Sequence, residues 1–223
     1  MSQEFIFYAI PYMFKGLLLT LRLAMASLAV GIAVGLPLSF LRVYGGKAVK
    51  WFVIGFSEIF RCTPVLIQLF MVYYGFPQIG ITLEPNVCAI IVLGLNSAAF
   101  QIEYLRSAIE AVGKKQLEAA RSLGMSRTKA MLRIIVPQAI RMILPNWSNE
   151  AVSMIKNTGI LYLIAVLDLM GQTKRIISKF YNPIDSYALV ALFYLVVVTI
   201  ISAAFNYLEK RLKIPGLILE DER

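Results

Sequence analysis

The chain is dominated by runs without charged residues, and each run approaches the length that a helix needs to cross a bilayer. A spanning α-helix takes about 20 mostly apolar residues. Runs of this kind lie at residues 23–41, 62–83, 85–102, 151–167 and 186–207. Residues 16–22 extend the first run, the third is expected to continue past Glu103, and the fourth contains Lys156 and is expected to start near residue 143. The pattern predicts an all-α integral membrane protein with five transmembrane helices.

Composition supports a membrane location. Hydrophobic residues make up 59% of the 223 residues and charged residues 16%, whereas soluble domains hold about 45–50% and about 25%. A net charge of +9 in a soluble protein would suggest nucleic-acid binding. Here the Lys and Arg residues cluster between apolar runs, which is typical of membrane proteins. We expect lipid, and no nucleic acid, around this chain.

The residues used most often in catalysis and metal binding are scarce. Histidine is absent, which excludes His-based catalysis and His metal sites. Cys62 and Cys88 lie in or beside apolar runs and form neither a disulfide framework nor a metal-binding spacing. The N-terminus has no basic region before its first charge, Glu4, so it does not resemble a cleaved signal peptide. We predict no catalytic residues and no metal site.

The basic residues also predict an orientation. Lys and Arg are frequent after the first run, in residues 106–141, where there are eight, and after the fifth run. The opposite side has none in residues 80–86 and three in residues 168–185. Because positive loops stay in the cytoplasm, we expect a multi-pass protein of the cell (inner or plasma) membrane with its N-terminus outside and its C-terminus inside.

Three segments follow from these boundaries. Residues 3–14 are apolar but short, and Pro11 interrupts them, so we interpret residues 1–15 as an N-terminal interfacial segment. Residues 16–208 form the predicted transmembrane domain, and residues 209–223 a cytoplasmic tail. Within the first run, Gly31 and Gly35 have the spacing of close helix–helix packing.

The longest segment between apolar runs, around residues 108–137, is predicted to be ordered. Residues 116–123 favour a helix, and Gly124 stands where a glycine ends one. Ser126 can cap a second helix over residues 127–135, which Pro137 stops or kinks. The result is a compact helix–turn–helix.

This segment carries a motif. It reads Glu118-Ala119-Ala120, three residues, Gly124, nine residues, Ile134, one residue, Val136-Pro137. The pattern resembles the EAA loop of ABC importer permeases, E-A-A-x3-G-x9-I-x-L-P, with Val136 in place of Leu. The alternative interpretation of residues 118–124, without a coupling role, is an alanine-rich surface helix with a glycine cap.

Two further stretches agree with this resemblance. Residues 61–69, R-C-T-P-V-L-I-Q-L, are similar to the R-G-T-P-L-L-V-Q-L stretch of polar amino-acid permeases, with Cys62 in place of Gly. Residues 148–150 (S-N-E) and 156–158 (K-N-T) resemble the family's fourth core helix. The likeness covers roughly residues 10–212, and it is closest to the histidine/arginine/glutamine-type permeases.

The resemblance implies a fold and a set of partners. The fold is the type I ABC importer transmembrane domain, with two permease chains, identical or homologous, around a central pathway. The partners are two copies of an ATP-binding subunit and an extracytoplasmic amino-acid-binding protein. The EAA loop would couple to the ATPase through Glu118, Ala119, Ala120, Gly124 and Pro137.

ATP chemistry is not expected on this chain. The sequence contains no G-x-x-x-x-G-K-[ST] phosphate-binding loop and no nucleophile–base set. We therefore expect ATP and Mg²⁺ on the partner subunit, no cofactor bound by this chain, and no enzymatic activity of its own.

Two apolar runs carry polar stripes at helical spacing. The fourth run has Asn146, Glu150, Ser153 and Asn157, and the third has Asn96, Phe100, Glu103 and Ser107. A charge at the bilayer centre costs about 2.5–3.5 kcal/mol on insertion scales. Such stripes are therefore expected to face the helix bundle or a wet cavity.

From these stripes we predict that Asn96, Glu150, Ser153 and Gln68 line the substrate pathway. Glu150 could accept the ammonium group or a cationic side chain of an amino acid, which favours basic amino acids, with polar neutral ones next. The alternatives are that Glu150 pairs with Lys156 or Arg141, and that Gln68 makes an interhelical hydrogen bond. Lys156 is the weaker alternative, because six residues turn a helix by roughly 600°. Glu103 could pair with Arg106.

Two other functions stay open at this point. An ion-coupled secondary transporter usually carries internal repeats, and none is visible here. A non-transport membrane scaffold would explain the ordered loop but not the polar stripes. Co-purification of a P-loop ATPase would separate an ABC permease from both.

Overall fold

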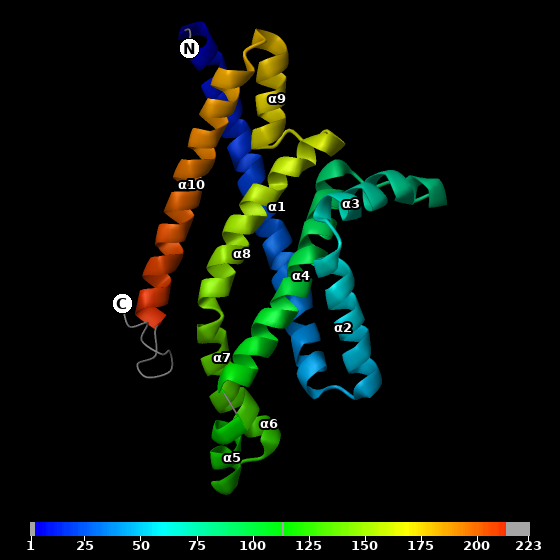
Figure 1. The fold of residues 1–223 in the computed structure, drawn as a ribbon, viewed down its shortest axis with the longest axis vertical. Coiled ribbons are helices and arrows are strands. Elements are labelled where there is room, and N and C mark those ends of the chain that lie inside the picture. The colour runs from blue at the N-terminus through cyan, green and yellow to red at the C-terminus, as the bar shows by residue number, and fades with distance from the viewer. Residues whose placement is uncertain (1–2, 113, 213–223) are drawn as a thin grey trace.

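The computed structural model describes residues 3–112 and 114–212, in which every regular element is a helix (Figure 1). In chain order the elements are α1 (Gln3–Tyr44), α2 (Lys47–Cys62), α3 (Val65–Phe70), η1 (Met71–Gly75), η2 (Phe76–Ile79), α4 (Pro85–Val112), α5 (Lys114–Ser122), α6 (Arg127–Ala130), η3 (Met131–Ile135), α7 (Val136–Met142), α8 (Leu144–Asn157), η4 (Thr158–Ile164), α9 (Leu169–Phe180) and α10 (Pro183–Leu212). The predicted all-α class is confirmed.

Three single helices, α1, α4 and α10, are long and apolar enough to cross a membrane. Two bent pairs also qualify when each is taken as one span. The pair α2 with α3–η2 bends by 101°, and the pair α8–η4 with α9 bends by 49°. Counted in this way, the described residues hold up to five spans by length and composition, the number predicted.

The contact between α1 and α4 holds the centre of the bundle together. A Cβ added at Gly35 would lie 2.5 Å from Cβ of Gln101, and one added at Gly31 would lie 2.6 Å from Oγ of Ser97. Residues of α4 therefore lie directly against the backbone of α1, as small residues allow in membrane helices. The predicted packing role of Gly31 and Gly35 is confirmed.

The first helix is longer than its apolar run indicated. It continues from Gln3 to Tyr44 with Pro11 and Pro37 inside it. The expected interruption at Pro11 is therefore wrong. Neighbouring helices can satisfy the backbone groups that a proline frees in a membrane. The interfacial placement of residues 1–15 stays a prediction. At the other end, α10 covers residues 209–212 of the predicted tail, and residues 213–223 lie outside the described residues.

The predicted second span was wrong as a single straight helix over residues 62–83. The chain turns sharply at Thr63, whose backbone is extended (φ −102°, ψ 139°), because Pro64 disfavours the helical conformation of the residue before it. The span instead combines α2 and α3–η2. Charged residues in α2, such as Glu58 and Arg61, hid it from a search for charge-free runs.

The segment after the fourth run also differs from a simple loop. Helix α8–η4 ends at Ala165, which has a left-handed backbone (φ 62°), and α9 begins after Asp168. The Asp168 side chain caps α9 by accepting a hydrogen bond from the Gly171 backbone N–H at 2.9 Å. In Figure 1, α9 lies beside the starts of α1 and α10, at the opposite end of the molecule from α5 and α6.

Candidate functional site

The turn between α5 and α6 has the geometry that the motif predicted. Gly124 has a φ of 81°, a conformation that side chains disfavour. The Met125 N–H donates to the Ala120 carbonyl at 3.2 Å, and the Gly124 N–H to the Arg121 carbonyl at 2.9 Å. These two bonds form a Schellman motif, which satisfies the free carbonyls at the end of α5.

The second half of this helical loop, residues 114–142, begins with the predicted cap. Ser126 Oγ accepts a hydrogen bond from the Lys129 N–H at 3.3 Å. The expected helix over residues 127–135 starts as α6 and changes at Met131 to the wider turn of η3. Pro137 does not stop it, because α7 continues directly from η3 with Pro137 in its first turn. Wider π turns of this kind commonly accompany kinks.

The predicted coupling residues divide by exposure. Glu118, Ala119, Gly124 and Pro137 are exposed, whereas Ala120 is buried at 3%. The tip also carries Leu123, 84% exposed, which the motif did not identify. A large apolar side chain held out at a rigid turn is suited to a hydrophobic groove on a partner.

Contacts between distant parts of the chain fix the orientation of this loop. Gln138 Nε2 on α7 donates to Gln116 Oε1 on α5 at 2.7 Å. Leu117 packs on a buried cluster that includes Leu105 of α4 and Ile135 of η3. The loop is therefore a rigid extension of α4 and α7.

The polar stripe on α8 is divided between two faces. Glu150 is buried at 6% against α4, where the Tyr104 hydroxyl donates to its carboxylate at 3.2 Å. Within the described ranges, no Lys or Arg nitrogen lies within 4 Å of that carboxylate. The alternative pairing of Glu150 with Lys156 or Arg141 therefore does not occur in this structure.

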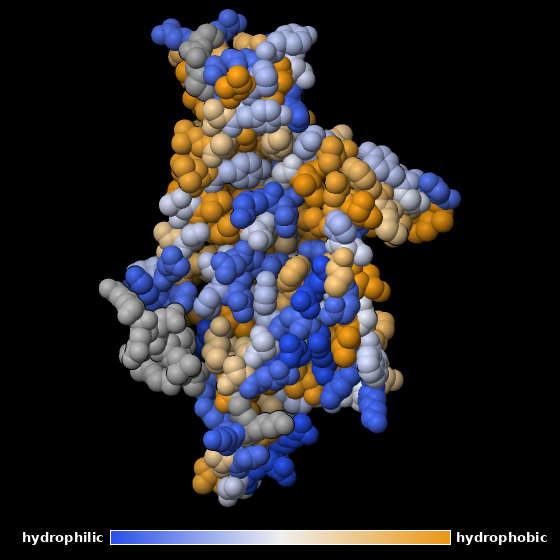
Figure 2. All heavy atoms as spheres, viewed as in Figure 1, coloured by the Kyte–Doolittle hydropathy of each residue, from blue (hydrophilic) through white to orange (hydrophobic). Residues whose placement is uncertain are grey.

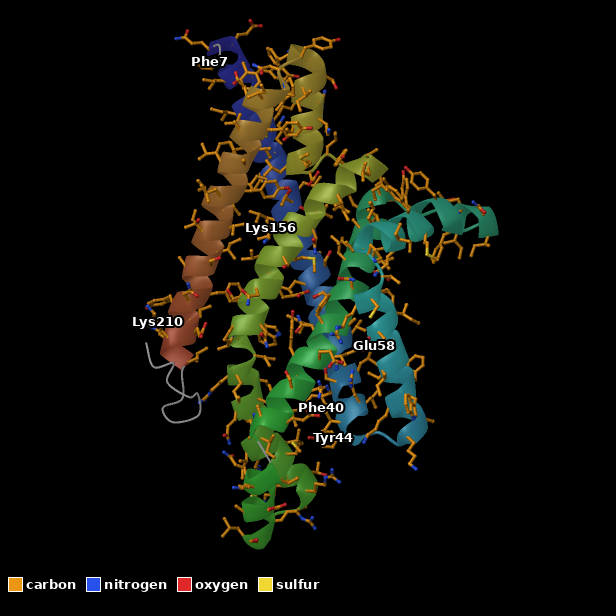
Figure 3. The ribbon with its side chains drawn as sticks, in the orientation of Figure 1. Phe7, Phe40, Tyr44, Glu58, Lys156 and Lys210 are labelled. Carbon is orange, nitrogen blue, oxygen red and sulfur yellow. The ribbon has the colours of Figure 1, made fainter. Side chains whose placement is uncertain are left out.

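The exposed face of α8 carries Asn149, Ser153 and Lys156, while Asn146 and Asn157 are half-buried. Figure 3 shows Lys156 on α8, away from either end of the bundle. Figure 2 shows hydrophilic side chains gathered along the middle of the molecule over α4 and α8, with hydrophobic side chains on both flanks. Asn149 and Lys156 were not among the predicted pathway residues, although their spacing with Ser153 places them on one helical face.

Asn96 and Gln68 meet at the end of α2. Asn96 Nδ2 donates to the Phe60 carbonyl at 2.7 Å, and Gln68 Nε2 donates to the same carbonyl at 2.9 Å. Gln68 Nε2 also lies 3.0 Å from the Thr63 carbonyl. A helix end leaves carbonyls without intrahelical partners, and these two amides supply partners at the sharp bend. The interhelical bonding considered for Gln68 is thus present.

Glu103 lies in a charged cluster that joins α1, α2 and α4. Its carboxylate pairs with Arg42, with Arg106 at 2.9 Å and with Arg61 at 3.6 Å. Its side chain is 15% exposed. The predicted pairing with Arg106 is confirmed, and the two partners from other helices were not predicted.

The described residues contain no group of three or more His, Cys, Asp or Glu side chains that could hold a metal ion. The candidate sites are therefore the helical loop and the polar face of α4 and α8.

Comparison with known families decides the identity. The family described as "Binding-protein-dependent transport system inner membrane component" matches residues 27–214. The chain belongs to this family. It is a multi-pass inner-membrane permease, and the family implies an ATPase and a substrate-binding protein as partners.

Similar proteins cover nearly all of the permease. The probable glutamine ABC transporter permease protein GlnM of Bacillus subtilis is 37% identical over 194 residues, 87% of this chain and 90% of the relative. The nopaline transport system permease protein NocM of Agrobacterium fabrum is 34% identical over 212 residues, 91% of this chain and 88% of the relative. A crystal structure of an amino acid ABC transporter with histidines is 33% identical, with a TM-score of 0.90 over 95% of this chain and 99% of that one.

Proposed function

We propose that this permease forms the translocation pathway of an ATP-driven amino-acid importer and couples to a separate ATPase subunit. The single observation that carries the proposal is the helical loop, in which the E-A-A-x3-G pattern coincides with a Schellman turn at Gly124. Relatives named for glutamine and nopaline, and a similar transporter solved with histidines, support amino acids as the substrate class.

In the coupling step, the loop inserts into a groove of the ATPase. The exposed Leu123 and Ala119 form its apolar tip, and the small side chain of Ala119 permits close approach. Because Leu117 and Gln138 fix the loop to the bundle, movement of the loop is transmitted to α4 and α7. ATP and Mg²⁺ belong to the partner, two copies of which serve two permease chains, identical or homologous.

The substrate pathway runs beside α8, between the buried Glu150 and the exposed Lys156. A zwitterion needs both an anionic and a cationic partner. Among the described residues, no Lys or Arg nitrogen lies within 4 Å of the Glu150 carboxylate, which is thus open to the substrate ammonium, and Lys156 supplies an exposed ammonium for the substrate carboxylate. Ser153 adds a hydroxyl between them on the helix. Asn96 and Gln68 border the pathway from α4 and α3, where they hold the end of α2.

An unpaired carboxylate within a span favours basic amino acids, with polar neutral ones next, because a buried charge is costly without a partner. The extracytoplasmic binding protein delivers the substrate. The transmembrane domain comprises residues 16–208, with the N-terminus outside and the helical loop in the cytoplasm.

Gly124→Val tests the coupling proposal. The space around a Cβ at Gly124 is open, so the cost of valine is that of the left-handed backbone alone, about 1–2 kcal/mol. We expect the variant to insert in the membrane but to lose ATPase co-purification and ATP-driven uptake in proteoliposomes. Gly124→Asn is the matched control, because Asn tolerates this conformation. Normal assembly and uptake by the valine variant would refute coupling through this loop.

Thiol labelling tests the orientation. Glu84→Cys and Lys129→Cys are introduced singly into a chain lacking Cys62 and Cys88, and intact cells are treated with an impermeant reagent. We expect the residue 84 position to react and the residue 129 position to be protected. The reverse pattern would invert the topology.

A further inference from the structure

Among the described residues, three buried polar atoms near the break between η4 and α9 have no hydrogen-bond partner. They are Asp168 Oδ2, Gln172 Oε1 and Tyr194 Oη. Asp168 is 0% exposed and Gln172 6%. Buried polar groups are nearly always satisfied, so three such oxygens on the segments that adjoin this break indicate a further partner.

The three oxygens come from α9, the residue before it, and α10. The Thr158 side chain adjoins both the Asp168 carboxylate and the Tyr194 hydroxyl. The Tyr194 hydroxyl also lies 3.3 Å from the Cβ position of Gly159. Gln172 follows Asp168 by one helical turn, and its Nε2 lies 3.4 Å from the Leu167 carbonyl.

Charge distinguishes the possible occupants. Among the residues of known placement, Asp168 has no Lys or Arg nitrogen within 4 Å. Its Oδ1 accepts the hydrogen bond from the Gly171 backbone N–H. A water molecule would satisfy the three oxygens but leave the buried carboxylate without a counter-ion, which is costly. A cation satisfies the oxygens and the charge together.

The donor set indicates which cation. All the available atoms are hard oxygens, and only one is formally charged, which fits a monovalent ion better than a divalent one. Unwound segments in broken membrane helices are places where transporters coordinate Na⁺. The segment between Ala165 and Asp168 is such a break.

We propose that Asp168, Thr158, Tyr194 and Gln172 form a binding site for one Na⁺ ion. The ion joins η4, α9 and α10 and stabilises the 49° bend between α8–η4 and α9. None of these four residues is among those assigned to the substrate pathway or to the helical loop.

Sodium titration of the purified permease, together with its partner subunits in detergent, tests the site. NaCl replaces choline chloride at constant ionic strength, and binding is followed by calorimetry and by the thermal unfolding midpoint. We expect saturable binding of one ion per permease chain, with a rise in the midpoint. Asp168→Asn should abolish both effects.

Tyr194→Phe removes one neutral ligand. It is the second test variant and replaces Asp168→Asn if that protein does not fold. It should weaken the apparent Na⁺ affinity at least about tenfold. Tyr207→Phe on the same helix, where Tyr207 is 56% exposed, is the matched control and should bind as the wild type does. Absence of saturable Na⁺ binding in the wild type, or unchanged binding by Asp168→Asn, would overturn the proposal in favour of water or a proton.

Discussion

Glu103 lies on α4 and Glu150 packs against it. The two carboxylates have opposite electrostatic settings. Glu103 is surrounded by guanidinium groups from three helices. Glu150 is more deeply buried, and its hydrogen bond from Tyr104 is neutral. In the part of the chain that the structure describes, three arginines neutralise the first charge, and no Lys or Arg nitrogen lies within 4 Å of the second. The first carboxylate therefore serves the fold, and we infer that the second serves the substrate.

The largest effect is expected from Glu103→Gln. The change leaves three arginines close together without their central anion, and removing one partner of a buried ion pair costs about 3–5 kcal/mol. The measurement is thermal or denaturant unfolding of the purified protein in detergent. A loss below about 1 kcal/mol would show that the cluster is well solvated and would remove the contrast with Glu150.

Arg42→Gln should have an intermediate effect. Arg42 comes from α1 and its side chain is 15% exposed, but Glu103 keeps Arg61 and Arg106 when it is lost. A hydrogen bond to a charged group contributes about 1.5–3 kcal/mol, and we expect a loss of stability in this range by the same unfolding assay. A loss equal to that of Glu103→Gln would mean that Arg42 alone balances the carboxylate.

Arg61→Gln should cost least of the cluster variants. Arg61 lies 3.6 Å from Glu103 and its side chain is 32% exposed, and exposed ion pairs contribute about 0–1 kcal/mol. The comparison of Arg42→Gln with Arg61→Gln ranks the arginines by burial. A reversed order in the unfolding assay would contradict that ranking.

The backbone of the helical loop was predictable because its determinants are local. Gly124, Ala120 and Ser126 lie within seven residues of one another, so the end of one helix and the cap of the next could be inferred from their spacing. The packing of Gly31 and Gly35 followed in the same way from one short pattern. Structures closed by hydrogen bonds between near neighbours need no knowledge of the fold.

The charged and polar contacts were less predictable because they join distant residues. Arg106 is three residues from Glu103 and was expected as its partner, whereas Arg42 and Arg61 lie on other helices. Likewise, the spacing on α8 identified Glu150 and Ser153 as neighbours on a helix. The packing of α8 against other helices decides that Glu150 is buried, beside Tyr104 of α4, while Ser153 and Lys156 remain exposed.

The most direct test of the contrast is the effect of Glu150→Gln on substrate choice. Uptake of arginine, lysine and histidine is compared with that of glutamine in proteoliposomes containing the ATPase subunit and saturating binding protein. If Glu150 neutralises a cationic substrate, losing an interaction of about 1.5–3 kcal/mol should lower the uptake of the basic amino acids at least about tenfold relative to glutamine. An unchanged ratio would contradict the account and would assign Glu150 to the structure of the α4–α8 contact alone.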